Sequence, residues 1–397
     1  MVITIYKYEL QKKKKKKKKK KKMDDEPLIL QNDGELSKVD KIEYSLPTVL
    51  HVAGQSCISG LQHIPISTEF LLFKAQPFNK TIVTEFILLA FCQLQHLQIL
   101  LFAFVLLAFI CCVLGNSAIL VLVRYARSLH TPMYFFISNF ALLEIIFVSV
   151  TVPKLLANLI ESSRKITFTG CFAQLYAFNS LGVAECYLLA VMAFDRDLAI
   201  NNPLRYPSIM NKSHYIELAV APWIIGFFIA AIPTTFTVEL EFCGPNEVNH
   251  FFCDLSPIQN LACSNPLSSN LATSFSALFA SVLPFMIILG FYIHIIATIS
   301  KIKGTVGKQK AFSTCSSHLI VASLFYSSVI IVYVRPKGSQ HDKFLALVYT
   351  VIIPLLNPFI YTLRNKDVKA ALRKSIPLRV LGQIKISHLQ QDHCRSS

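Results

Sequence analysis

Charge is scarce in this 397-residue chain: only 16% of its residues are Asp, Glu, Lys or Arg, whereas 53% are hydrophobic. A soluble domain carries about 25% charged residues, so the composition excludes an ordinary water-soluble protein. Several apolar runs instead reach the length of roughly 20 residues that crosses a bilayer as a helix. These runs are too continuous for the alternating strands of a membrane barrel. The sequence therefore predicts an all-α, multi-pass membrane protein.

Signatures of catalysis and of metal binding are also missing. No two of the eleven cysteines have the C-x-x-C spacing of zinc or redox sites. Ser313, Thr314, Ser317 and His318 cluster together, but no acidic residue nearby would orient the histidine as in a hydrolase. We interpret these four residues as polar groups at a helix start. No glycine-rich loop suits a phosphate group either. We therefore expect no enzyme activity, no metal site and no cofactor.

A block of lysines, Lys12–Lys22, supplies much of the net charge of +16. Such low-complexity runs are typical of solvated, disordered tails, and no aromatic residues alternate with the lysines as a nucleic-acid surface would need. We expect no nucleic-acid partner. The sequence predicts a disordered extension at 1–76, a membrane domain at 77–375 and a cytoplasmic tail at 376–397. The sequon that begins at Asn79 predicts a glycan just before the first apolar run.

Seven apolar runs predict a bundle of seven transmembrane helices. The predicted spans are 97–123, 134–157, 171–198, 215–235, 271–299, 312–334 and 343–363. Lysine and arginine concentrate in the loops after the first, third and fifth spans, for example Arg124, Arg127, Lys301 and Lys308. Because basic loops stay on the cytoplasmic side, the N-terminus is expected outside.

Four cysteines lie on the predicted outer side. Cys171 opens the third span, and Cys243, Cys253 and Cys263 lie in the long loop after the fourth span. An oxidising compartment favours disulfides there. Four cysteines allow three pairings, so the spacing alone leaves the connectivity open.

Polar side chains also fall inside the apolar runs. Asn116, Glu144 and Asn357 each need an internal partner, because an unpaired polar group in lipid is costly. Either the three face one another across the bundle, with water or a sodium ion between them, or each makes a separate interhelical hydrogen bond. Pro284 and Pro354 lie within the fifth and seventh spans and predict kinks.

The third span ends in an acid and a base side by side, Asp195 and Arg196. One interpretation is a charge pair at a helix end in the lipid headgroups, where arginine is common. The other is a functional pair, because ionisable groups near a bilayer core tend to mark function.

Seven spans, the Asp195-Arg196 pair and the Asn-Pro-x-x-Tyr motif that ends at Tyr361 resemble the rhodopsin-like G-protein-coupled receptors. The resemblance is closer to the olfactory (odorant) receptors, and four motifs carry it in order over about residues 77–375. They are Leu129–Tyr134 (LHTPMY), Met192–Tyr206 (MAFDRDLAINNPLRY), Lys310–His318 (KAFSTCSSH) and Pro354–Asn365 (PLLNPFIYTLRN).

The resemblance implies a location and a mechanism. It implies a multi-pass protein of the plasma membrane whose partners are a small odorant, a heterotrimeric G protein of the stimulatory, olfactory type and the lipid bilayer. Asp195 and Arg196 would form an inner latch that opens to admit the G protein and so raises cAMP. A short amphipathic helix would follow the seventh span. Residues that would rearrange on activation are Tyr292, Asn357, Pro358 and Tyr361. The implied disulfides are Cys171 with Cys253 and Cys243 with Cys263.

The resemblance also implies a pocket between the third, fifth and sixth helices for a small, volatile, mostly apolar ligand. Each of its candidate lining residues has helix packing as an equal alternative. By position these candidates are Phe178, Asn179, Gly182, Val183, Ser276, Ala280, Tyr326, Val329 and Tyr333.

Two residues depart from the family pattern: Asp197 stands where the family usually has Tyr, and Asn201 where it usually has Cys. A second acid within reach of Arg196 would over-stabilise the latch or repel an acidic partner, so one alternative is a receptor fold that no longer signals. Another alternative is a transporter or channel. Such a protein would be expected to show inverted repeats, and this chain shows no internal repeat.

Overall fold

The computed structural model describes the chain from the last residues before the first span to the helix after the seventh. The described residues are 83–91, 96–161, 163–302, 304–334, 342–364 and 366–375, without the side chains of 306, 310–314, 332–334, 363, 364, 366, 374 and 375. The predicted extension and tail, the sequon at Asn79 and the side chain of Tyr333 lie outside this set.

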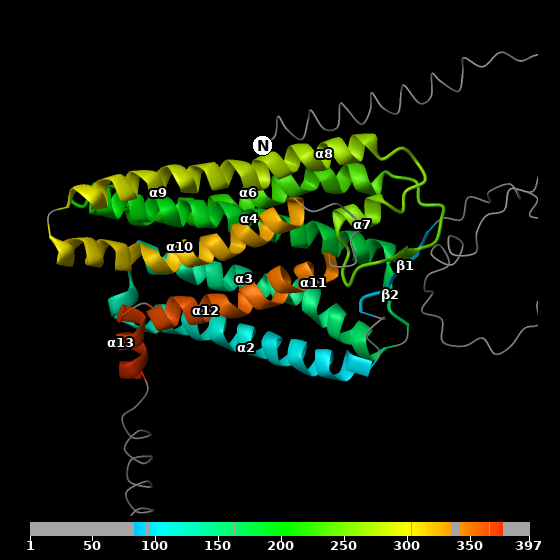
Figure 1. Ribbon diagram of the computed structural model, residues 1–397, viewed down its shortest axis with the longest axis horizontal. Coiled ribbons are helices and arrows are strands. Elements are labelled where there is room, and N and C mark those ends of the chain that lie inside the picture. Colours follow the sequence, from blue (N-terminus) through cyan, green and yellow to red (C-terminus); the bar gives the residue numbers. More distant parts are fainter. Residues whose placement is uncertain are drawn as a thin grey trace, which may run out of the picture. The chain divides into compact units, whose positions relative to one another are not determined.

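Long helices form the bundle shown in Figure 1. They are α2 (Gln98–Tyr125), α3 (Pro132–Ile160), α4 (Phe168–Asn201), α6 (Lys212–Val238), α8 with α9 (Leu267–Ala277 and Leu283–Lys301), α10 (Thr305–Val334), and α11 with α12 (Asp342–Leu347 and Ile353–Arg364). Within the described residues six helical stretches are long and apolar enough to cross a membrane, and the apolar part of α10 covers Cys315–Ile331. The seven predicted spans are thus confirmed as helices, and most extend a few residues beyond the apolar runs.

Two spans contain a wide, π-helical turn rather than a break. Turn η3 (Leu278–Val282) joins α8 to α9, and turn η4 (Val348–Ile352) joins α11 to α12. Each turn ends two residues before a proline, Pro284 or Pro354. Proline lacks an N–H group and its ring clashes with the carbonyl four residues earlier, so a wider turn there relieves the clash.

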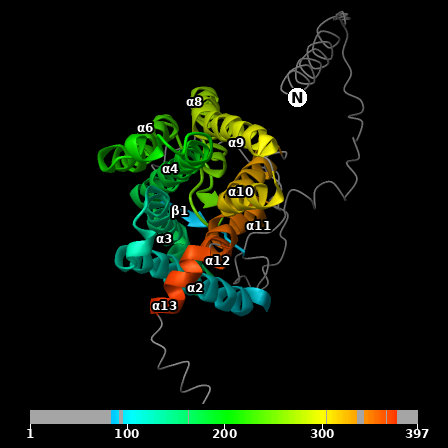
Figure 2. The same ribbon diagram turned by 90° about the vertical axis from the view of Figure 1, so that its left-hand side faces the viewer.

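Helix α4 lies in the middle of the bundle, with α3, α6, α9 and α10 around it in the view along the helices (Figure 2). Its closest neighbour is α6, because Gly226 lets the two backbones approach. A β-carbon on Gly226 would collide with the Ser180 carbonyl oxygen and lie 3.1 Å from the Ala184 nitrogen. Small residues serve close helix packing in membranes in this way.

A small sheet covers the outer end of the bundle, and no periodicity in these short segments predicts it. Strand β1 (Glu85–Leu88) lies between β2 (Lys165–Thr167), to which it is antiparallel, and β3 (Glu247–Val248), to which it is parallel. Phe86 and Leu88 point into a buried cluster around Cys171 and Cys253. The sheet thereby connects the segment before α2 to the loop between α3 and α4 and to the long loop after α6.

Short helices complete the described chain. They are η2 (Arg127–Leu129), α5 (Tyr206–Ile209), α7 (Leu255–Gln259) and α13 (Lys366–Ser375). Helix α13 is the short helix expected after the seventh span, and it buries Val368 and Ala371 against the bundle. The Tyr134 hydroxyl of α3 donates a hydrogen bond of 3.0 Å to Asp367 Oδ2 and holds α13 in place.

Candidate functional site

The predicted inner latch is a hydrogen-bonded cluster of a buried acid, a buried arginine and a half-buried tyrosine. Arg196 Nε donates a hydrogen bond of 2.9 Å to Asp195 Oδ2, and Arg196 Nη2 binds the same oxygen. Tyr206 of α5 donates from its hydroxyl to Asp195 Oδ1 at 2.7 Å. Burial, and then the Asp195 charge, raise the pKa of Tyr206, so this hydroxyl stays a donor. Asp195 and Arg196 are buried, which argues against a charge pair exposed to headgroups.

Asp197 does not bind Arg196. Its carboxylate instead accepts a hydrogen bond from Asn201, one turn later on α4, and contacts the imidazole of His294 on α9. The two departures from the family pattern therefore contact each other. Asp197 is also buried, so it does not present its charge to a protein partner.

His318, which the sequence predicts to be a polar group at a helix start, joins three helices. From α10 its Nδ1 lies 2.6 Å from the Tyr292 hydroxyl of α9, and its Nε2 lies 3.0 Å from the Leu189 carbonyl of α4. A carbonyl only accepts, so Nε2 carries the proton and, in the neutral ring, Nδ1 accepts from Tyr292. In the sequence, the feature that could have indicated this role is the position of the histidine directly before a long apolar run.

The polar residues inside the bundle come together only in part. Asn357 of α12 donates through Nδ2 to Glu144 Oε1 of α3. Asn116 of α2 instead donates to the carbonyl of Cys112 in its own helix, at 3.0 Å. Among the described residues no hydrogen bond joins Asn116 to the other two. Glu185 of α4 is also buried.

Pro358 and Tyr361 place the seventh helix against its neighbours. Gly115 of α2 lies against the Pro358 ring, and a β-carbon on Gly115 would be 3.1 Å from Pro358 Cγ. Tyr361 is buried and its ring meets Phe140 of α3 edge to face, with centroids 6.0 Å apart. The motif residues of α12 therefore pack against α2 and α3.

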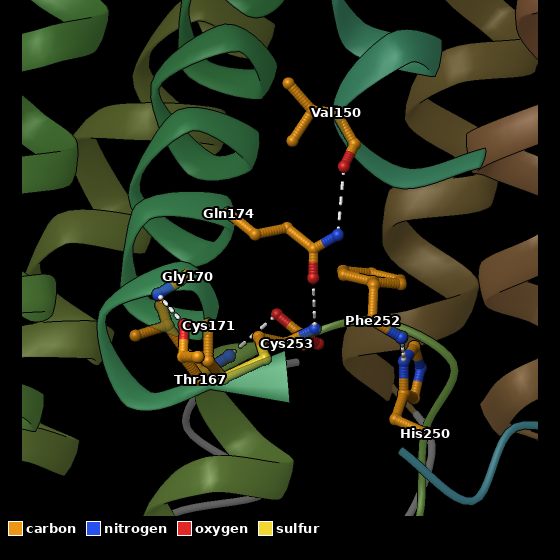
Figure 3. The surroundings of a disulfide bond; sticks show 10 residues. Val150, Thr167, Gly170, Cys171, Gln174, His250, Phe252 and Cys253 are labelled. Atoms are coloured by element: carbon orange, nitrogen blue, oxygen red, sulfur yellow. Dashed lines mark hydrogen bonds between the residues drawn. A yellow bond between two sulfur atoms is a disulfide. The ribbon is translucent and has the colours of Figure 1, made fainter. Parts of the chain in front are cut away.

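The outer end of α4 is fixed by a disulfide and by one glutamine (Figure 3). Cys171 is joined to Cys253, and Cys243 to Cys263, which is the pairing that the resemblance implies. Gln174 accepts from the Cys253 N–H at 3.0 Å and donates to the Val150 carbonyl of α3 at 2.9 Å. The long outer loop is thus attached to both α3 and α4.

Aromatic side chains of this loop pack together with two from neighbouring segments. We use the name aromatic lid for Phe91, His250, Phe251, Phe252 and Phe344. His250 stacks on Phe251 and meets Phe252 edge to face, while Phe91 contacts both Phe251 and Phe344. Burial is the main cause that lowers the pKa of His250 to about 3, and the nearby Lys343 charge lowers it further. The lid is therefore built around a neutral histidine.

Acid is expected to destabilise the receptor through His250. Its folded pKa of about 3 lies below the ordinary value of 6.5, so its contribution is complete above pH 6.5 and is lost as the pH falls toward 3. From about pH 7.5 to about pH 5.5 the free energy of unfolding should fall by about 1.4 kcal/mol from this residue. Thermal unfolding of purified protein at both pH values measures it. A His250→Phe variant should lack this part of the fall, and an equal fall in both proteins would contradict the assignment.

Two of the candidate lining residues, Phe178 and Asn179, lie on α4 and contact neighbouring residues. Phe178 packs against Phe147 of α3, Phe252 of the lid and Tyr349 of η4, with centroids 4.9, 4.6 and 6.2 Å apart. Asn179 donates to the carbonyl of Leu175 in its own helix. These two residues are therefore held by their neighbours.

Other candidates lie nearer to α9 and α10. The Tyr326 ring packs at a tilt against Phe285 of α9, with centroids 5.1 Å apart, and its buried hydroxyl has no hydrogen-bond partner among the described residues. On α4, a β-carbon on Gly182 would meet no atom within 4 Å. The remaining candidates are Val183 and Ser276, which are buried, and Ala280 and Val329, which are half-buried. Their role in ligand binding stays a prediction.

The architecture is that of a rhodopsin-like G-protein-coupled receptor with seven spanning helices. Its third span carries a buried Asp-Arg pair at the inner end and a disulfide to the outer loop at the other end, and its Asn-Pro-x-x-Tyr segment packs on the second span. A family model described as "Olfactory receptor" matches residues 104–378. The chain belongs to the olfactory receptor family, whose members are multi-pass proteins of the plasma membrane and not enzymes.

Curated relatives match over nearly their whole length. The chain is 44% identical to human "Olfactory receptor 10A7" over 311 residues, which are 78% of this chain and 98% of the relative. It is 46% identical to human "Olfactory receptor 11H4" over 77% of this chain and 96% of the relative. Mouse "Olfactory receptor 6E1" is 44% identical over 75% of this chain and 96% of the relative.

Proposed function

We propose that this receptor binds a small, mostly apolar odorant between α4, α9 and α10 and activates a stimulatory, olfactory-type G protein that raises cAMP. The observation that carries the proposal is the buried Asp195–Arg196–Tyr206 latch in a chain of the olfactory receptor family. The division into an extension at 1–76, a receptor domain at 77–375 and a tail at 376–397 belongs to the same proposal, as does a glycan on Asn79.

The surroundings of Gly182 support the ligand site. The open space at this glycine lies in the outer half of α4, a helix that packs against both α9 and α10. Apolar pockets with few polar groups suit small volatile molecules. Tyr326, whose buried hydroxyl has no hydrogen-bond partner among the described residues, would offer a ligand one polar group, and the buried Val183 an apolar one.

The position of Asp197 bears on the alternative of a silent receptor. That alternative needs a second acid bound to Arg196 or exposed to a partner. Asp197 is buried and bound to Asn201 and His294 instead, so neither objection applies to this arrangement. A ligand that binds the open inner face more tightly than the closed one would then shift the equilibrium by that difference in affinity.

A cAMP assay in transfected cells tests the proposal. A panel of volatile alcohols, aldehydes, ketones, esters and hydrocarbons should contain a compound that raises cAMP with dose. Arg196→Ala should abolish the response at equal surface expression, because the latch residue that a G protein would engage is gone. Arg205→Ala removes a neighbouring exposed arginine and should leave the response unchanged.

Comparison of the full chain with one that starts near Pro77 separates the extension from the receptor domain. A surface-labelled receptor of either length that answers no compound in the panel would contradict the proposal. A response that persists in Arg196→Ala would contradict the role of the latch.

A further inference from the structure

Three polar side chains join the inner ends of α4 and α9, beyond the Asp195–Arg196 pair. Asn201 Nδ2 lies 2.6 Å from Asp197 Oδ1. His294 Nδ1 lies 2.9 Å from that same oxygen and 2.9 Å from Asn201 Nδ2. Two of these side chains stand on α4 and the third on α9, so the cluster is an interhelical contact.

Hydrogen-bond chemistry assigns the protons in this triangle. An ionised carboxylate only accepts, so both nitrogens must point a proton at Asp197 Oδ1. The Asn201 amide donates one, and His294 Nδ1 donates the other. The two nitrogens are then both donors and do not bond to each other. Bonds of this kind, with a charged acceptor, are stronger than neutral ones.

The cluster fixes the turn of α4 that carries the latch. Asp197 follows Arg196 directly, and Arg196 is already bound to Asp195. Two residues before His294, Tyr292 of the same α9 holds His318 of α10. Helix α9 is therefore tied to α4 at His294 and to α10 at Tyr292, close to the inner face.

We infer that Asp197, Asn201 and His294 form a clamp that holds α4 and α9 together in the closed receptor and limits signalling without ligand. His294 and Asn201 are positioning residues that act through Asp197 on the neighbouring Arg196. The inference rests on the proposed coupling to a G protein. Entry of such a partner requires the inner ends of the helices to move, and a contact present only in the closed arrangement opposes that movement.

Basal signalling without odorant is the first test. His294→Leu should raise surface-normalised basal cAMP about tenfold or more, the shift expected when a hydrogen bond to a charged group is lost from one state alone. His294→Asn keeps an N–H donor at the position of Nδ1 and should return basal cAMP toward that of the parent. A merely structural role of the ring would not predict this rescue.

A matched control lies on α6. His214 is half-buried near the inner face, and its Nδ1 lies 3.9 Å from Glu217 Oε2 in the same helix. His214→Leu should leave basal cAMP unchanged. Unchanged basal cAMP in His294→Leu, or an equal rise in His214→Leu, would overturn the clamp as a brake on signalling.

A zinc experiment tests the contact without any G protein. Asp197→His in the full chain sets two imidazoles across the α4–α9 contact, and paired histidines bind Zn²⁺. Zinc chloride should raise the unfolding temperature of this purified variant by several degrees, as binding to the folded state alone does. Adding His294→Leu to the same variant should abolish the shift.

The zinc measurement and the cAMP measurement can fail independently of each other. Absence of a zinc shift in Asp197→His would overturn the contact itself. A zinc shift in a receptor that shows neither basal nor odorant-driven cAMP would support the contact and overturn the proposed signalling function.

Discussion

Gly226→Ala is expected to lower surface expression at least about tenfold, although alanine usually favours a helix over glycine. The added β-carbon would collide with the Ser180 carbonyl and lie 3.2 Å from the Ala184 β-carbon. Backbone atoms cannot turn aside as a side chain would, so α4 and α6 must separate. Overpacking of this kind costs about 1–3 kcal/mol and sometimes more. Flow cytometry of surface-labelled receptor against total receptor measures the loss.

Gly290→Ala provides the matched control for this prediction. Gly290 lies in α9, and a β-carbon there would meet no atom within 4 Å. This change should leave surface expression equal or slightly higher, because alanine restricts the unfolded chain more than glycine does. Equal expression of the two variants would show that α4 and α6 do not pack at Gly226 as described.

Cys171→Ser is expected to abolish surface expression and any odorant response. The Cys171–Cys253 disulfide spans 82 residues, and closure of a loop that long accounts for about 4.5 kcal/mol in the chain-entropy account. Its loss also frees the loop that Gln174 binds. Cys253→Ser should have the same effect, as should the double replacement, because either change breaks the same bond.

Cys243→Ser should be milder. Its disulfide to Cys263 spans 20 residues, worth about 3 kcal/mol on the same reasoning, and lies within one loop. Cys111→Ser, a change at a free cysteine of α2, should have little effect. Surface labelling with a maturation assay ranks the five variants. Normal expression of Cys171→Ser would contradict a structural role for this disulfide.

The spans were predictable because burial in lipid demands long apolar runs, but their ends were not. The sixth span is apolar only from about residue 312, whereas α10 begins at Thr305. Polar residues continue a helix once it leaves the hydrocarbon, and hydropathy does not report them. The outer sheet escaped prediction for another reason. Strand β1 pairs with β3 across 160 residues of chain, and strands of two to four residues carry no usable periodicity.

The candidate site was likewise predictable only in part. Asp195, Arg196 and Asn357 stand in local motifs, so sequence alone located them. Asp197 was expected beside Arg196 because they are neighbours in the chain, but its partner is His294, 97 residues away. The apolar run predicts a helix that begins at about residue 312, which would put His318 near its start. The earlier start at Thr305 places it among buried residues instead. Contacts between helices decide both cases.

The wide turn η3 has a consequence for how the receptor responds to insertions and deletions. A π-helical turn accommodates one residue more than an α-helical turn, and one residue corresponds to about 100° of rotation around the axis. Removal of one residue within Leu278–Val282 would leave every apolar run intact. Because the wide turn holds the extra residue, the deletion there would leave an ordinary α-helical turn and keep α9 in its rotation relative to α8. The same deletion in the regular turns between Leu283 and Tyr292 would rotate the inner part of α9 by about that angle and move His294 away from Asp197. The wide turn is thus the point of this span that tolerates a one-residue deletion best.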